Sequence, residues 1–176
     1  MKFILNVELL TKQAFEPFGD VIETEGSQHF SINNGSTERF HDLANIDVSA
    51  EKGRPIVSIF RAQPLQMSLS VKMMERHPLG SQTFIPVGGE PFLVLVAPLG
   101  EEVSQDKLRL FQTNGGQGVN YHRGVWHHPV LALKPDQEFI IIDRAGEGNN
   151  CDEFFFGADS QIIVEYGQGS QPVDRE

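Results

Sequence analysis

Glycine and proline interrupt this chain so often that no long helix fits between them. The 176 residues include 17 glycines and 10 prolines, and the segments that they separate are short. Both residue types break regular structure, and turns that contain them commonly join short strands. The spacing therefore predicts an all-β fold with only a few short helices, such as one over Lys12–Phe15 capped by Thr11.

Several segments have the period or composition of β-strands. Residues 68–73 alternate polar and apolar side chains, as in a strand with one buried face. Residues 91–97 are apolar throughout, which is typical of a strand covered on both faces. Because no amphipathic helix joins the segments, a barrel or a double-sheet jelly roll is favoured over a parallel βαβ sheet. The predicted strands are Pro55–Arg61, Ser68–Met73, Thr83–Val87, Pro91–Ala97, Leu108–Gln112, Val125–Leu133 and Glu138–Arg144.

Length and charge limit the classes of protein to which the chain can belong. We expect one domain over residues 1–165, large enough to build its own core, and a polar tail over residues 166–176. The formal net charge of −10 repels nucleic-acid phosphates and anionic lipids, so neither is an expected partner. No apolar run approaches the roughly 20 residues of a membrane-spanning helix. A single cysteine, Cys151, suits a reducing cytoplasm.

A carboxylate and an imidazole extend the apolar face of one predicted strand. Side chains two apart share a face, so the apolar face of residues 69–73 continues to Glu75 and His77. A buried carboxylate is costly without a partner, and a metal ion, an arginine or a bound substrate would each supply one. The alternative is structural, with Glu75 paired to Arg76 or Arg54 at the rim and His77, before Pro78, capping a turn.

More imidazoles gather in the segment NYHRGVWHHP, residues 120–129. The segment contains His122, His127 and His128. The last two point to opposite faces of a regular strand, so at most one of them joins a given pocket. For each histidine, a hydrogen-bonded position in the core or in a turn is the alternative to a role in chemistry.

The spacing of these residues resembles the two metal-binding motifs of cupin barrels. Glu75, His77 and Gln82 fall on the ligand positions of the first motif, and His127 falls on the histidine of the second. This sequence departs from the pattern, because Glu75 replaces a histidine, Gln82 replaces an acid and His122 replaces a proline. The resemblance implies a cupin-type double-stranded β-helix, which is a jelly-roll barrel.

A closer resemblance, spread from residue 14 to residue 153, is to the ureidoglycolate lyase family of allantoin degradation, also called ureidoglycolate hydrolase. It implies a cytoplasmic carbon–nitrogen lyase that cleaves (S)-ureidoglycolate to glyoxylate and urea. It also implies a homodimer and a divalent metal, with nickel as the first candidate. The segments that carry it are AFEPFGDVIE (14–23), INNGSTERFHDLA (32–44), FRAQP (60–64), ERHPLGSQTFIPVGGEPFLVLVA (75–97), TNGGQGVNYHRGVWHHPVLAL (113–133) and IIDRAGEGNNCDE (141–153).

The resemblance and the cupin spacing together imply roles for individual residues. A planar guanidinium matches the two oxygens of the substrate carboxylate. A neutral amide is a poor metal ligand, so Gln82 has substrate or water as its alternative partner. Without a metal, the imidazoles and Glu75 would carry out the proton transfers alone, since histidine titrates near neutral pH. The expected catalytic residues are Glu75, His77, His122 and His127; the expected metal ligands are Glu75, His77, Gln82 and His127; the expected substrate contacts are Arg61, Arg123 and Gln82.

Two other functions are compatible with a cupin barrel. The chain could be a different metal-dependent enzyme of small carboxylic acids, such as an isomerase or a dioxygenase, or a non-catalytic barrel that binds a small molecule. A separate sequence feature, Asn33-Asn34-Gly35, predicts a tight turn. Such a turn could also serve as a lid or as part of a dimer contact.

Overall fold

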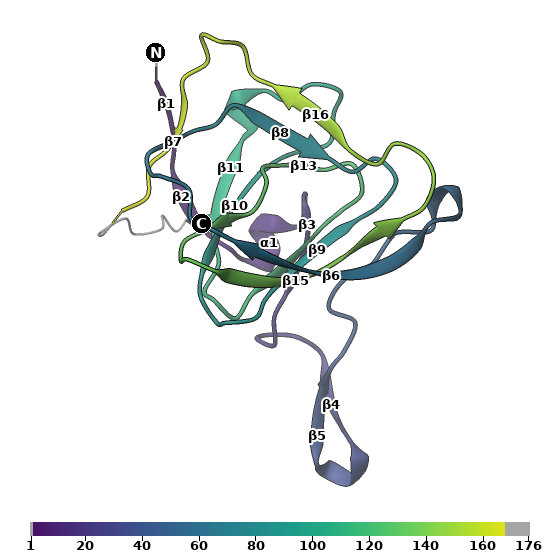
Figure 1. The fold of residues 1–176 in the computed structure, drawn as a ribbon. Coiled ribbons are helices and arrows are strands. Elements are labelled where there is room, and N and C mark those ends of the chain that lie inside the picture. The colour runs from purple at the N-terminus through teal and green to yellow at the C-terminus, as the bar shows by residue number, and fades with distance from the viewer. Residues whose placement is uncertain (1, 168–176) are drawn as a thin grey trace.

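The computed structural model describes residues 2–167, and its body is a barrel in which two β-sheets enclose a common core (Figure 1). This arrangement confirms the predicted all-β barrel with few short helices. The first sheet runs through β3 (Gly19–Ile22), β12 (Gly118–Tyr121), β9 (Gln82–Pro86), β15 (Gln137–Ala145) and β6 (Arg54–Ala62). The second runs through β16 (Asp152–Phe155), β8 (Met73–Arg76), β13 (Trp126–His127), β10 (Phe92–Ala97), β11 (Arg109–Gln112) and β2 (Val7–Leu9), with β14 (Leu131–Ala132) also paired to β10.

Smaller elements cover the outside of the barrel and one end of its core. A three-stranded sheet consists of β1 (Phe3–Leu5), β17 (Ile162–Val164) and β7 (Leu69–Ser70). The predicted short helix is confirmed as α1 (Lys12–Phe15), and the Thr11 side chain accepts a hydrogen bond from the amide of Ala14 at 3.1 Å. Two 3-10 turns, η2 (Ala50–Lys52) and η3 (Gln105–Lys107), lie in connections. Within residues 2–167, no helix has the length and apolar character that crossing a bilayer requires.

Strand β10 is buried on both faces because it separates two hydrophobic clusters. Phe92, Val94 and Val96 point into the barrel, where they pack with side chains of the first sheet. The alternate residues pack on the other side of β10, in a cluster that the three-stranded sheet helps to cover. Each large apolar side chain buried in this way stabilises the fold by roughly 1.5–3 kcal/mol. The uniformly apolar sequence of residues 91–97 is thus explained.

Two predicted strands are each split in the structure. Residues 68–73 do not form one strand, because the chain leaves β7 and joins a different sheet at β8. At the break, the amide of Val71 donates to the carbonyl of Ile162, while the carbonyl of Lys72 accepts from Phe156. The predicted strand over residues 125–133 is divided into β13 and β14, with Pro129, which has no amide hydrogen to donate, between them.

The break between β7 and β8 changes which side chains share a face. Val71 and Met74 are both fully buried in the outer cluster, although they are three residues apart. The alternation predicted to run unbroken from residue 69 to His77 therefore shifts by one residue. Glu75 still faces the interior, in common with Met73 but not with Val71.

A two-stranded hairpin stands away from the barrel (Figure 1). It is made of β4 (His29–Ile32) and β5 (Thr37–Phe40), with the 3-10 turn η1 (Asn33–Gly35) at its tip. The three turn residues have φ angles of 52°, 56° and 87°, which asparagine and glycine tolerate well. The predicted turn is thus confirmed, whereas the predicted tail over residues 166–176 lies almost wholly outside the described residues.

Candidate active site

Three side chains with metal-ligand chemistry meet inside the barrel. Glu75 lies on β8, His77 follows directly after that strand, and His127 lies on β13. The antiparallel register places His127 opposite Glu75, so the two side chains share a face. One ligand atom from each of the three residues lies within 4.8 Å of the others. One carboxylate and two imidazoles at this separation can hold a single divalent metal ion.

The hydrogen bonds of His127 leave one ring nitrogen available for a ligand. Its Nδ1 lies 3.1 Å from the carbonyl oxygen of Val125, so Nδ1 carries the proton and Nε2 carries a lone pair. The side chain is 2% exposed, and Nε2 has no hydrogen-bond partner among residues 2–167. It faces Glu75 Oε1 at 3.5 Å. His127 Nε2 and Glu75 Oε1 are both acceptors, and a cation between them would stabilise both. These residues therefore fit a metal ion.

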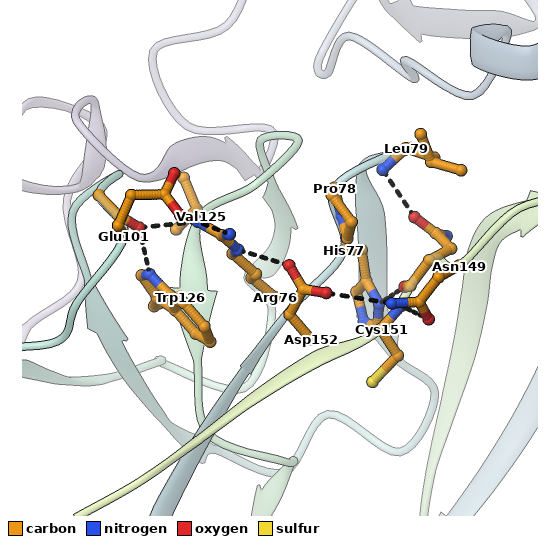
Figure 2. A network of polar contacts seen from close by, with 12 residues as sticks. Arg76, His77, Pro78, Leu79, Glu101, Val125, Trp126, Asn149, Cys151 and Asp152 are labelled. Carbon is orange, nitrogen blue, oxygen red and sulfur yellow. Dashed lines mark hydrogen bonds and ion pairs between the residues drawn. The ribbon is translucent and has the colours of Figure 1, made fainter.

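His77 is held by the loop that follows β15. Its Nδ1 lies 2.7 Å from the carbonyl oxygen of Asn150, and its Nε2 lies 3.1 Å from Gln82 Oε1. A neutral imidazole has one proton, so it cannot donate to both oxygens. With the proton on Nδ1, Nε2 carries a lone pair that faces Gln82 Oε1. Figure 2 shows His77 directed toward the loop segment that carries Asn149 and Cys151.

A buried arginine fastens the same loop to the barrel. Arg144, on the outer face of β15, donates to the carbonyl oxygens of Ala50 at 2.8 Å and Glu147 at 2.9 Å. Its side chain packs so closely on Gly53 that a Cβ added there would lie 2.3 Å from the guanidinium Nε. The loop that orients His77 is thus tied to a second loop, which contains η2.

An aromatic side chain forms one wall of the site. The Tyr121 ring stacks on the His127 ring with centroids 4.3 Å apart and an angle of 9° between the planes. Tyr121 also lies opposite Gln82 in the pairing of β12 with β9. Burial, and after it the charge of Glu75, raises the pKa of Tyr121, so its phenol stays protonated. The sequence analysis missed this residue, although its alternation with Val119 on the same strand marks both as interior.

Burial and neighbouring charges shift the pKa values in the cluster. Burial works to raise the pKa of Glu75, but the two nearby imidazoles, His127 first and then His77, outweigh burial and lower that pKa. Burial lowers the pKa of His127 despite the nearby carboxylate. At neutral pH the pair therefore consists of a carboxylate and a neutral imidazole, which are the forms that bind metals.

His122 lies apart from the cluster. It follows Tyr121 at the end of β12 and turns to the opposite face, where its Nε2 lies 3.2 Å from Asp20 Oδ1. Its side chain is 44% exposed. It borders a cavity of about 200 Å³ that is also lined by Asn45, Asp47, Ser81 and Arg123. The structure therefore brings together Glu75, His77, Gln82 and His127, but it does not add His122 to them.

The arginines near the site have partners elsewhere. Arg123 donates to the carbonyl oxygen of Pro78 at 2.5 Å, directly after His77 in the chain. Arg61 is exposed on β6 and pairs with Glu138 at 2.7 Å. Arg76 stacks over Trp126 and pairs with Asp152 at 2.9 Å (Figure 2). Arg76 is thus paired with an acid other than its neighbour Glu75.

Similar proteins span almost the whole chain. Residues 2–165 match the family model described as ureidoglycolate lyase. A ureidoglycolate lyase of Stutzerimonas stutzeri is 58% identical over 167 residues, which cover 95% of this chain and 98% of the relative. A relative of the same name from Azotobacter vinelandii is 59% identical over 161 residues, 92% of this chain and 97% of the relative. Another, from Pseudomonas fluorescens, is 59% identical over 160 residues, 91% and 96% of the two chains.

Proposed function

The chain belongs to the ureidoglycolate lyase family, and from that premise we propose that it cleaves (S)-ureidoglycolate to glyoxylate and urea. The observation that carries this proposal is the convergence of Glu75, His77 and His127 within 4.8 Å inside the barrel. These groups supply proton acceptors and metal ligands, and the reaction needs no nucleophilic side chain.

The chemistry of the substrate defines what the site must do. Ureidoglycolate has a carboxylate, a carbinol hydroxyl and a ureido group on one carbon. The hydroxyl loses its proton, the bond from that carbon to the urea nitrogen breaks, and the nitrogen gains a proton. The products are glyoxylate and urea, with no change in oxidation state and no added water. The enzyme therefore has to anchor the carboxylate and move one proton from the hydroxyl to the urea nitrogen.

The same three residues would hold a divalent metal, and we propose nickel. The unpartnered Nε2 of His127 and the facing carboxylate of Glu75 support a metal there, with Gln82 beside His77 as the fourth group. A bound metal ion lowers the pKa of a hydroxyl that coordinates it and orients an α-hydroxy acid.

Glu75 is the group that we assign to the proton transfer. Its pKa is lowered, so it is a carboxylate at neutral pH and has oxygen lone pairs that can accept a proton. A carboxylate has two oxygens, so one can stay with the imidazoles while the other takes the carbinol proton and delivers it to the urea nitrogen. The stacked ring of Tyr121 and the carbonyl of Val125 hold His127 in place beside it.

Arg123 is the stronger candidate for the carboxylate anchor. It contacts the carbonyl oxygen of Pro78, which follows His77 in the chain, and it lines the cavity that Asp47, Ser81 and His122 also border. Its one protein hydrogen-bond partner among residues 2–167 is a neutral carbonyl oxygen, so its charge is not neutralised by a carboxylate. Arg61 is a weaker candidate for the anchor, because it pairs with Glu138 and lies on the outer face of its strand.

Assembly and compartment complete the proposal. We expect a homodimer in the cytoplasm, where the exposed thiol of Cys151 would stay reduced. A dimer is supported by an apolar surface on the outer face of the first sheet. Val57 and Ile59 on β6 are 71% and 67% exposed, and Ile140 lies opposite Ile59 on β15. Exposed apolar patches of this kind commonly mark protein interfaces.

A coupled assay for glyoxylate and urea tests the proposed function. Racemic ureidoglycolate is supplied with and without EDTA, and ammonia and oxygen uptake are measured in parallel. We expect glyoxylate and urea in equal amounts from half of the racemate, and loss of the rate on chelation. Ammonia in place of urea would indicate amide hydrolysis, oxygen uptake would indicate a dioxygenase, and the absence of any product would contradict the proposal.

A further inference from the structure

Asp143 is an acidic residue on the interior face of β15. Phe139 and Ile141, on the same strand, are fully buried in the core of the barrel. Side chains alternate along a strand, so Asp143, two residues further, points the same way. Its neighbour Arg144 points to the outer face, where it contacts backbone carbonyls of two loops.

Strand pairing brings Asp143 beside the cluster. The register of β15 with β9 pairs Ile142 with Thr83, so the next antiparallel step sets Asp143 opposite Gln82. Directly opposite residues share a face, with their Cβ atoms about 4.5–5.5 Å apart. On its other side Gln82 lies opposite Tyr121. Asp143, Gln82 and Tyr121 thus form a row across the inner wall of the first sheet.

The row lies against the metal-ligand group of the second sheet. Gln82 contacts His77 Nε2 at 3.1 Å, and Tyr121 stacks on His127. Asp143, at the end of the row, is not within the 4.8 Å group formed by the three ligand atoms. It is therefore placed to contact a molecule bound at the metal-ligand group, without belonging to that group.

One oxygen of Asp143 is left without a donor. Oδ1 is buried, and residues 2–167 supply it with no hydrogen bond. Leaving a buried acceptor unpaired is unfavourable, and more so for a charged group. The site thus presents a carboxylate oxygen that is complementary to N–H donors from a bound molecule.

We propose that Asp143 binds the ureido end of the substrate by accepting its N–H hydrogen bonds. This inference rests on the proposed function. The ureido group offers N–H donors, whereas the other end of the substrate is a carboxylate that Asp143 repels. Asp143 therefore decides which way the substrate lies: the ureido group toward β15 and the carboxylate away from it.

The substitution Asp143→Asn tests the assignment, because it keeps the size of the side chain but removes its charge and one acceptor. We expect the KM for ureidoglycolate and the inhibition constant of urea to rise at least tenfold. The inhibition constant of glyoxylate, which has no N–H group, should stay within twofold or fall. Asp136→Asn is the matched control, since Asp136 is an exposed acid in the turn before β15 that pairs with Gln63. It should leave all three constants unchanged.

The outcomes separate this inference from the proposed function. Unchanged urea inhibition in Asp143→Asn would overturn the role of Asp143 while the wild-type enzyme still releases urea. Equal weakening of inhibition by urea and by glyoxylate, together with loss of bound metal, would also overturn the role of Asp143. It would show that Asp143 is a metal ligand or a structural group. Wild-type enzyme that urea does not inhibit would contradict the ureido pocket itself. If Asp143→Asn does not fold, as judged by thermal unfolding, Asp143→Ala is measured in the same way.

Discussion

The molecule contains two imidazole–carboxylate pairs of similar geometry in very different surroundings. His127 and Glu75 approach to 3.5 Å inside the barrel, and His122 and Asp20 approach to 3.2 Å near its surface. The side chain of His127 is 2% exposed and that of His122 is 44% exposed. An exposed pair is screened by water and contributes at most about 1 kcal/mol. The comparison teaches that the two pairs differ in burial, and not in how closely the imidazole approaches the carboxylate.

The two histidines lie only five residues apart, and a turn separates them. Gly124, between them, has a φ of 78°, which glycine adopts without strain. The chain leaves β12 with His122 on the outer face and enters β13 with His127 opposite Glu75. The turn at Gly124 thus places the side chain of His122 near the surface and that of His127 inside the barrel.

The largest expected effect on activity comes from replacing Glu75 or His127, the buried pair. Glu75→Gln and His127→Asn should each lower kcat/KM at least about a hundredfold, because general acid–base groups typically contribute 10²–10⁴. His122→Asn, the matched change in the exposed pair, should lower it less than tenfold. Steady-state assays of the three variants measure the difference. A hundredfold loss in His122→Asn would instead give this residue the role in acid–base catalysis that was expected of it from the sequence.

Removal of metal should distinguish the two pairs in a second way. A ligand present at a hundred times its Kd stabilises the folded state by about 2.7 kcal/mol. For a chain of this size we expect chelation to lower the Tm by about 5 °C or more. His122→Asn should respond as the wild type does, and His127→Asn should not respond. An equal response of both variants in calorimetry would place the metal elsewhere.

The arginines allow a test of the substrate anchor near the exposed pair. Arg123→Ala should raise KM at least tenfold, a loss of about 1.4 kcal/mol of binding. Arg61→Ala removes a guanidinium that already pairs with Glu138, and we expect less than a threefold change. Kinetics of the two variants with ureidoglycolate decide between them. The reverse ranking would move the anchor to β6.

The smallest expected effect is on the pH dependence of stability. Because burial lowers the pKa of His127, the unfolded chain binds a proton more readily than the folded chain does. This contribution to stability is complete above the ordinary pKa of histidine, about 6.5, and declines as pH falls toward the lowered pKa. Urea unfolding of metal-free protein between pH 7.5 and 5 should show a decline that is shallower in His127→Asn. An identical slope in both proteins would contradict the shift.

Much of the fold follows from local sequence signals. The apolar run over residues 91–97, the Asn33–Gly35 turn and the short helix capped by Thr11 were each recognisable, because each depends on neighbouring residues. The split between β7 and β8 was not, since it depends on partners from β17 and on Phe156, far along the chain. Glu75 was placed correctly although the alternation leading to it is broken.

Site residues could be predicted where their spacing along the sequence follows the geometry of a strand. They were harder to predict where a turn lies between them. Glu75, His77, Gln82 and His127 were chosen together and lie together. Asp143 was overlooked because its strand reads as apolar, although its alternation with Phe139 and Ile141 was visible in the sequence. Tyr121 was overlooked for a related reason, since its role depends on stacking against a residue of another sheet.

The contacts of Arg144 link two loops to the imidazole of His77. A side chain at Gly53 would collide with the guanidinium, which holds the loop at Glu147, and the carbonyl of Asn150 in that loop sets the proton on His77. A substitution at Gly53 is therefore expected to displace His77, although Gly53 does not belong to the group formed by Glu75, His77 and His127. Neighbouring residues of β15 thus have different surroundings: Asp143 faces the interior of the barrel beside Gln82, and Arg144 holds the loops outside it.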